Sequence, residues 1–363
     1  MISALGCNTN MVYHAVNARI SAYESVDYFT QNRERMNMAL VPDGALPPLI
    51  NELNPRGKIH FRHSRILRMC HVAAAEAMAN FTGKAPIPLF FSAPADDVGL
   101  TEQFPRKFIH YLVLQSGLPI DAAASRLIGT GRTGGLEALD LALRYLYDTD
   151  AECVLIGGGE SFQDSELLAA LDKEGRINAP GVPDGFAPGE GAAFVLLTRN
   201  PALAMHSATH IPTLLPPGRA NEPGHLFSDE PYRGEGLAKA FRLALAAYEG
   251  ETKIAHVYSS MNGENYWAKE YGVAMVRTRE AFAESTTVHH PADCYGDLGA
   301  ATGTTLMALA AQRVMLNKPP RPWLIYCSSD HTYRAAACFE PVALTTLPPP
   351  VEPTPPSVWS PTL

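Results

Sequence analysis

Apolar and polar positions in the first half of the chain follow spacings typical of helices and strands. Leucines at every third or fourth position predict a helix after a glycine-rich turn, and short unbroken apolar runs predict buried strands. The expected elements are a helix over 106–117, a strand over 125–128, the turn over 129–135, a helix over 136–147, and strands over 153–156 and 192–197. We expect the glycines at 157–159 to end the strand before them.

The second half of the chain repeats this order. The expected elements are a helix over 237–248, a strand over 254–258, a glycine-bearing turn over 296–303 that leads into a helix, and strands over 323–327 and 335–339. The order turn, helix, strand, turn, strand thus occurs twice. Duplicated halves of this kind predict a layered α/β fold with mixed sheets between helices.

Prolines divide the chain into its expected parts. We expect a first half over 1–200, a proline-rich connection over 201–232, a second half over 233–345 and a proline-rich tail over 346–363. The prolines of the connection favour a crossing loop. The seven prolines of the tail favour a polyproline II segment, with an end that takes no fixed structure as the alternative.

Charge and hydropathy exclude several kinds of partner. The net charge is −8, whereas nucleic-acid binding needs a basic face, and no apolar run is long enough to span a bilayer. Only six residues precede Cys7, too few for the apolar stretch of a lipoprotein signal. We therefore expect a cytoplasmic protein with reduced thiols and with no nucleic-acid or membrane partner.

One block of sequence is specific enough to indicate a family. Residues 184–193, Asp-Gly-Phe-Ala-Pro-Gly-Glu-Gly-Ala-Ala, resemble the DGF-x-x-GEGA signature of the β-ketoacyl synthases. Three weaker matches keep the family's order: Ile-Gly-Gly-Gly-Glu-Ser at 156–161, Ile-Ser-Ala-Leu-Gly at 2–6, and Gly-Gly-Leu-Glu-Ala-Leu at 134–139. The chain begins inside the match at 2–6, so the family's usual first strand is expected to be missing.

The resemblance implies a thiolase-like, five-layered αβαβα fold with two duplicated halves, and a homodimer. It also implies a condensation of acyl thioesters with an acyl carrier protein as partner. In the family, a cysteine at the start of the helix predicted over 136–147 carries the acyl group. The helix start lowers the pKa of that thiol and binds the oxyanion, and two histidines assist.

The positions that match the family's catalytic residues carry other side chains. Arg132 stands at the cysteine position, Ser260 at the first histidine and Asp297 at the second. The family's lysine falls near Ala292, and its glycine-rich gating loop falls at 328–334 without those glycines. A guanidinium stays protonated and is no nucleophile, and a serine hydroxyl does not titrate near neutrality. We therefore expect no catalytic residues at these positions.

Arg132 needs an anionic partner, because a cation at a helix start is unfavourable by about 0.3–1 kcal/mol. The resemblance implies that the starts of the two duplicated helices meet at one site, which makes Asp297 the candidate. We expect an Arg132–Asp297 ion pair that fills the pocket and holds the halves together; the alternative is that both side chains face solvent separately. The remnant of the pocket is expected to be lined by Thr130, Arg132, Thr133, Asn262, Asp297 and His331.

Other patterns near this turn allow different chemistry. Residues 129–134 match Gly-x-Gly-x-x-Gly between a strand and a helix, as in dinucleotide sites, although Glu160 is a poor ribose-binding acid. Thr133 could be the nucleophile of a strand–turn–helix elbow, but the sequence places no histidine beside it. Asp96 and Asp97 are more typical of a solvated loop than of a catalytic carboxylate pair.

Two cysteines could have taken over catalysis. Cys294 follows the histidines at 289–290, and Cys327 precedes His331, so either thiol could pair with an imidazole. A buried structural thiol is the simpler interpretation of both. Metal binding within the loop at 289–294 is disfavoured because neighbours in one loop rarely converge on an ion, and we expect no metal and no cofactor.

These observations favour a non-catalytic β-ketoacyl synthase-like protein that binds another protein as a scaffold, adaptor or chaperone. Similar synthase-like proteins without the catalytic triad occur among bacterial type VI secretion accessory factors, which would make the partner a secretion cargo. One alternative is a chain-length-factor-like partner of an active synthase. Another is an acyl-thioester transferase, similar to the 3-oxoacyl-carrier-protein synthases, with relocated catalytic residues.

Overall fold

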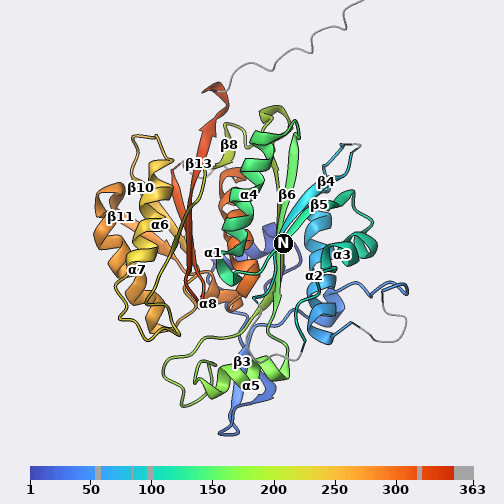
Figure 1. Ribbon diagram of the computed structural model, residues 1–363, viewed down its shortest axis with the longest axis vertical. Coiled ribbons are helices and arrows are strands. Elements are labelled where there is room, and N and C mark those ends of the chain that lie inside the picture. The colour runs from blue at the N-terminus through green and yellow to red at the C-terminus, as the bar shows by residue number, and fades with distance from the viewer. Residues whose placement is uncertain (54–58, 84, 96–101, 317–320, 347–363) are drawn as a thin grey trace, which may run out of the picture.

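The computed structural model describes residues 1–53, 59–83, 85–95, 102–316 and 321–346. Two β-sheets alternate with three layers of helices (Figure 1), which confirms the predicted five-layered αβαβα fold. Each layer buries the apolar face of its neighbours, as the repeated strand and helix patterns predict.

The first sheet is built from the first half of the chain, in the strand order β1-β7-β6-β4-β5. The strands are β1 Ile2–Ser3, β4 Ile87–Ser92, β5 Ile120–Ile128, β6 Cys153–Ser161 and β7 Glu190–Thr198. β4 runs parallel to β5 and β6, whereas β7 is antiparallel to β6, so the sheet is mixed. Every residue of β4 and β6 is buried, as expected for strands covered by helices on both faces.

The second sheet has the strand order β11-β10-β12-β13-β8, with β9 also paired to β13. The strands are β8 His210–Leu214, β9 Gly218–Asn221, β10 Ile254–Ser259, β11 Phe282–His289, β12 Trp323–Ser328 and β13 Tyr333–Ala343. β10 is parallel to β11 and β12, and β13 is antiparallel to β12. The second sheet therefore repeats the mixed plan of the first.

Helices cover both sheets and fill the space between them (Figure 1). The outer layers are α2 Phe61–Ala77 with α3 Phe108–Ser116 on the first sheet and α6 Glu235–Ala246 with α7 Asn265–Thr278 on the second; the central pair is α4 Gly134–Asp148 and α9 Thr302–Met315. The smaller elements are α1 Thr9–Asn17, α5 Ser165–Lys173, α8 Ala292–Tyr295 and the hairpin of β2 Glu24–Phe29 and β3 Arg35–Met38. The largest apolar cluster lies between the sheets and includes side chains of both α4 and α9.

The first turns of α4 and α9 pack directly against each other. A Cβ atom on Gly135 would lie only 2.7 Å from the backbone nitrogen of Thr304, and one on Gly303 would lie 3.1 Å from the Cα of Gly135. Glycine at both positions therefore permits the two helix starts to touch. The segments that precede these helices are brought together as a result, and the candidate site is built there.

The glycines at 157–159 do not end β6, contrary to our expectation, and the strand continues through them. A Cβ atom on Gly158 would lie 2.8 Å from the carbonyl oxygen of Ala300, and one on Gly159 would lie 2.7 Å from Sγ of Cys70. These glycines are thus places where neighbouring layers approach the strand closely, and they are not turn residues.

The proline-rich connection also differs from the predicted crossing loop. It contains β8 and β9, which both pair with β13 in the second sheet. Pro212 lies in β8 opposite Pro341. β8 is an edge strand, where a proline without an N–H group is tolerated. The predicted boundaries at 200 and 233 stay predictions.

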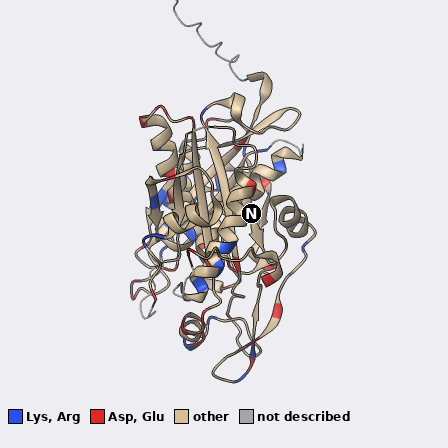
Figure 2. Ribbon diagram, turned by 90° about the vertical axis from the view of Figure 1, so that its right-hand side faces the viewer, with Lys and Arg blue, Asp and Glu red and all other residues tan. Residues whose placement is uncertain are grey.

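Two expectations concern residues outside the described part of the chain: Asp96 with Asp97, and the tail over 347–363. Among the described helices, none is both long and apolar enough to cross a membrane. Figure 2 shows acidic and basic residues interspersed along the ribbon.

Candidate functional site

The candidate site lies where the two halves present equivalent turns. Arg132 belongs to the short 3₁₀ turn η2 Gly131–Thr133, which leads into α4. Asp297 comes just before the corresponding turn η5 Gly299–Ala301, which leads into α9. Gly131 (φ 66°) and Gly299 (φ 45°) both take the left-handed backbone conformation that glycine favours. The same local structure therefore delivers one cation and one carboxylate to the same point.

Arg132 and Asp297 form a bidentate ion pair. Nε of Arg132 lies 2.8 Å from Oδ2 and 3.1 Å from Oδ1 of Asp297, and Nη2 also donates to Oδ2. Both side chains are buried, with 5% and 2% exposed. The structure thus brings together the two residues for which the sequence suggested a pair.

The pair extends into a larger set of buried charges. Nη1 of Arg132 also donates to Asp330, which accepts two further hydrogen bonds from Arg176. Arg176 in turn holds Glu264 through two bonds of 2.7 and 3.0 Å. We call Arg132, Arg176, Glu264, Asp297 and Asp330 the inter-half cluster. Both arginines come from the first half of the chain and all three carboxylates from the second, so every ion pair in it joins the two halves.

Mutual attraction favours the charged forms of Arg132 and Asp330. Burial lowers the pKa of Arg132, but the carboxylates of Asp297 and Asp330 raise it further, to well above its ordinary value. Burial raises the pKa of Asp330, but Arg132 and Arg176 lower it to well below its ordinary value. These groups therefore stay charged near neutral pH and are unsuited to proton transfer.

Aromatic rings and an amide complete the surroundings of the two guanidinium groups. The Cζ of Arg132 lies 5.4 Å from the ring centre of Trp267, and the Cζ of Arg176 lies 5.4 Å from that of Phe186, both within cation–π distance. Trp267 donates from Nε1 to Glu264 at 2.9 Å. Nδ2 of Asn262 lies 2.8 Å from Oδ2 of Asp297. The charges are thus hydrogen-bonded and enclosed, which limits the cost of burying them.

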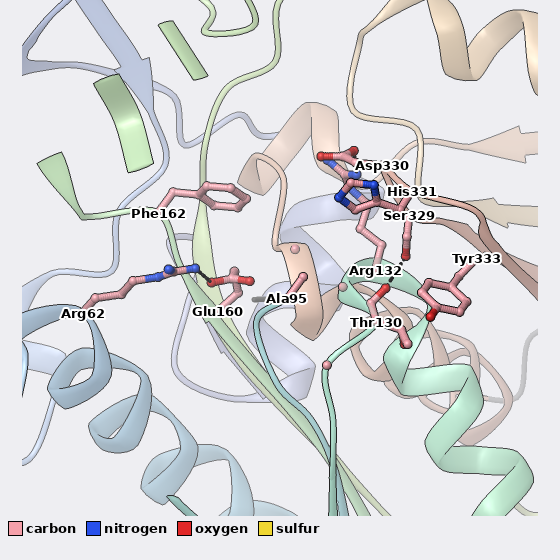
Figure 3. A pocket seen from close by; sticks show the side chains of 13 residues that line it. Arg62, Ala95, Thr130, Arg132, Glu160, Phe162, Ser329, Asp330, His331 and Tyr333 are labelled. Atoms are coloured by element: carbon pink, nitrogen blue, oxygen red, sulfur yellow. Dashed lines mark hydrogen bonds and ion pairs between the residues drawn. The ribbon is translucent and has the colours of Figure 1, made fainter. Parts of the chain in front are cut away.

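A small pocket opens beside Arg132 (Figure 3), with a cavity volume of about 80 Å³. Thr130 and His331 line it on one side, and the Arg62–Glu160 ion pair of 2.8 Å lies on the other (Figure 3). The glycine-rich turn at 129–131 also lines it. This volume is well below the roughly 300–1,000 Å³ of clefts that bind drug-sized ligands, and the Gly-x-Gly-x-x-Gly turn therefore borders a cavity that is small for a dinucleotide.

Thr133 has no imidazole partner. Its hydroxyl lies 3.1 Å from Glu137 and 3.2 Å from the carbonyl oxygen of Thr130, and its backbone N–H donates to Oγ of Ser329. The elbow hypothesis therefore lacks the histidine of the usual triad, and the titratable group that contacts the hydroxyl is the carboxylate of Glu137. The hydroxyl of Ser329 also takes up an amide at the helix start, which is where an oxyanion would otherwise bind.

Ser260 and His331 do not join the ion pairs. The hydroxyl of Ser260 accepts a hydrogen bond of 3.0 Å from the backbone N–H of Ser328, which is a structural role. His331 is exposed and packs its ring near those of His225 and Phe227 at the edge of the pocket. Of the predicted pocket residues, Thr130, Arg132 and His331 line the pocket. Asp297 belongs to the inter-half cluster, and Asn262 donates a hydrogen bond to it.

The structure does not place the thiols as nucleophiles. Burial raises the pKa of Cys327 and of Cys294 above the ordinary value, and a low pKa is the mark of a reactive thiol. His290, the nearest candidate base in sequence, interacts with Oγ of Ser259 at 2.8 Å. Within the described ranges, no group of three or more potential ligands could hold a metal ion.

Sequence reasoning did not find Arg176, Glu264 and Asp330. Asp330 follows a buried strand, where side chains gather at the sheet edge, and this signal could have suggested it. Arg176 and Glu264 lie in loops without a motif. The reasoning also did not predict the buried contact of Arg65 with Glu190 of the signature block, which explains why an acid can be buried there.

Sequence comparison finds relatives that are much larger than this chain. No family model matches. The polyketide synthase ThaG of Burkholderia thailandensis is 28% identical over 177 residues, which cover 45% of this chain and 3% of that protein. A phthioceranic/hydroxyphthioceranic acid synthase of Mycobacterium tuberculosis is 32% identical over 127 residues, which cover 33% of this chain and 6% of the synthase. The chain thus corresponds to a small part of these relatives.

Solved structures match over almost the whole chain. The ketosynthase ApeO in complex with its chain length factor ApeC from Xenorhabdus doucetiae gives a TM-score of 0.71 at 15% identity, with 94% of this chain and 96% of that chain covered. A β-ketoacyl synthase from Burkholderia phymatum gives 0.70 at 14% identity, covering 94% and 97%. The fold of the chain is therefore similar to that of the β-ketoacyl synthases, and part of its sequence is similar to parts of polyketide synthases.

Proposed function

We propose that this chain is a non-catalytic β-ketoacyl synthase-like protein that acts by binding another protein. The observation that carries the proposal is the buried Arg132–Asp297 pair, because it lies at the start of α4, where the resemblance places the nucleophile. A guanidinium held by two carboxylates can neither attack a thioester nor accept a proton. The pocket beside it is small and lined by charges, which suits an acyl chain poorly.

The first candidate partner is a second ketosynthase-like chain, in the manner of a chain length factor. One of the similar structures is a ketosynthase in complex with its chain length factor, and another is the ishigamide ketosynthase/chain length factor, with a TM-score of 0.71 at 16% identity over 93% of this chain and 96% of that chain. β5 supports such pairing, because it is an edge strand that pairs only with β4 among the described strands. An exposed edge offers backbone hydrogen bonds to a strand of a partner or of a second copy.

The second candidate role is that of an adaptor for an unrelated protein, such as a type VI secretion cargo. The enclosed inter-half cluster supports the adaptor role as well as the first role, since a protein whose site is filled by ion pairs can bind a partner in either role without catalysis. The two roles differ in the partner they require, and capture of the partner separates them.

Capture with the full-length chain as bait, followed by mass spectrometry, tests the proposal. We expect a ketosynthase or an acyl carrier protein for the first role and a secretion cargo for the second. Sedimentation of the purified chain alone and with the captured partner measures the stoichiometry. A chain that stays monomeric and yields a defined acyl-transfer product by itself contradicts the proposal.

An edge variant tests the interface. Ala122→Asp places a charge on the exposed side of β5 and should weaken association, because charges on an edge strand oppose pairing. Ala202→Asp, in the exposed turn η3 Pro201–Leu203, is the matched control and should leave association unchanged. Equal association of both variants would exclude β5 as the interface.

A further inference from the structure

A second polar cluster lies on the inner face of the second sheet, apart from the inter-half cluster. His256 of β10 pairs with Trp323 of β12, and Tyr258 of β10 pairs with His289 of β11. Alternation along β10 therefore places all four side chains on one face. Tyr258 and Trp323 belong to the apolar cluster that contains α9, so this face is the one toward the central helices.

Contacts through Trp323 and between the two imidazoles link the side chains of this cluster. The ring of His256 stacks on Trp323 with centroids 4.2 Å apart and an angle of 17°. Arg313 of α9 lies over Trp323, with its Cζ 4.8 Å from the ring centre. Nε2 of His289 lies 3.4 Å from Nδ1 of His256. We call His256, His289 and Arg313 the histidine–arginine cluster.

The positive charge of Arg313 is not paired with a carboxylate in the part of the chain that the structure describes. Arg313 forms no ion pair among the described residues, and its Nε is buried without a hydrogen-bond partner there. Burial, followed by the charges of Arg313 and Arg321, lowers the pKa of His256 to about 4. Burial, followed by His256, Arg313, His290 and Arg19, lowers that of His289 to about 4. The causes of both shifts are thus burial, arginines and neighbouring histidines.

Asp293 acts on the neighbouring His290. Asp293 raises the pKa of His290, whose shift is dominated by burial, and His290 is held by Oγ of Ser259. Arg19 and Arg321 are exposed, so their charges face the solvent side of the cluster. In a chain with a net charge of −8, a partly buried arginine between further cations is costly unless an anion accompanies it.

We propose that the histidine–arginine cluster binds a phosphoryl group. Arg313 supplies the charged donor fork that matches phosphate oxygens. One N–H of the two neutral imidazoles is used between the rings, and the other can donate to a ligand. β11 is an edge strand of its sheet, and His289 at its end is partly exposed. The aromatic face of Trp323 closes the site from the sheet side. This inference does not depend on the proposed function.

Titration of the full-length protein with inorganic phosphate, followed by NMR of the histidine side chains, tests the site. We expect saturable shifts of the His256 and His289 resonances, assigned with His256→Gln and His289→Gln. Sodium chloride at equal ionic strength should not reproduce them, because a screened surface charge responds to ionic strength alone. The absence of saturation, or an equal response to chloride, would overturn the proposal.

Two variants locate the binding contacts. Arg313→Gln removes the charged fork and should weaken phosphate binding by roughly tenfold or more. Because Arg313 packs on Trp323, Arg19→Gln at an exposed position serves as a second variant and should weaken binding by a smaller factor. Arg144→Gln, on the exposed face of α4, carries the same charge change as control and should bind like the unmodified chain. Unchanged affinity in both test variants would contradict the assignment.

Discussion

Replacement of Arg132 by methionine tests the inter-half cluster as the element that holds the site together. Methionine keeps much of the length of the arginine stem and removes the charge. Asp297 then retains only the amide of Asn262 and the N–H of Gly299, at 2.8 Å each. Asp330 keeps Arg176. The variant therefore leaves one buried carboxylate without a cation.

The expected cost follows from this imbalance. Removing one partner of a buried ion pair typically costs about 3–5 kcal/mol in the free energy of unfolding. For a chain of 363 residues, this loss corresponds to a decrease in Tm of about 4–7 °C. Asp297→Leu in the same chain removes the stranded carboxylate, so the double variant should recover much of the stability that Arg132→Met loses.

Urea unfolding monitored by circular dichroism provides the assay, with Arg35→Met as control. Arg35 pairs with Asp27 at 2.9 Å, but both side chains are more than half exposed, so that change should cost less than about 1 kcal/mol. If Arg132→Met costs no more than Arg35→Met, or if the double variant is less stable than the single one, the cluster does not hold the halves as described.

Three further predictions follow from the same structure. Gly135→Ala should destabilise the fold by at least about 3 kcal/mol in the same urea assay, because the added Cβ atom would meet the backbone of Thr304. In Gly272→Ala of α7 the added Cβ atom meets nothing within 4 Å, so this control variant should be slightly more stable than the unmodified chain. Asp330→Asn should reduce the slope with which the free energy of unfolding falls at acid pH. Burial raises the pKa of Asp330 but two arginines lower it more, so the contribution of this carboxylate to stability is complete above about pH 4 and is lost as the pH falls below that. Equal slopes for the variant and the unmodified chain would contradict this. Thiol titration of the native chain should modify Cys7 first, since the other five cysteines are buried; rapid labelling of a second thiol would reopen the search for a nucleophile.

Much of the fold is readable from local patterns. The helices at α4 and α6 and the strands at β10 and β12 follow leucine spacing or unbroken apolar runs. The predicted end of β6 at residues 157–159 was wrong, because the sequence does not distinguish a glycine that ends a strand from a glycine that allows neighbouring layers to touch. The prolines of β8 predicted a loop, because the sequence does not show that this segment pairs with β13 at the edge of the sheet.

The site was predictable only in part. Arg132 needed an anion because it precedes a helix, and the duplicated plan pointed to Asp297 as its partner. Arg176 and Glu264 lie 88 residues apart and meet only because the two halves stack. No local property of either residue reveals such a contact, and the extent of the buried cluster therefore required the structure.

The most direct test of the central claim is the intact mass of the full-length chain after incubation with an acyl-CoA, beside an active ketosynthase treated in the same way. A guanidinium in place of a thiolate leaves no thiol at the start of α4 to accept the acyl group, so we expect the mass of this chain to stay unchanged while the active enzyme gains one acyl group. A stoichiometric mass increase, mapped by peptide analysis to one residue of this chain, would show that it forms an acyl-enzyme and would contradict the account.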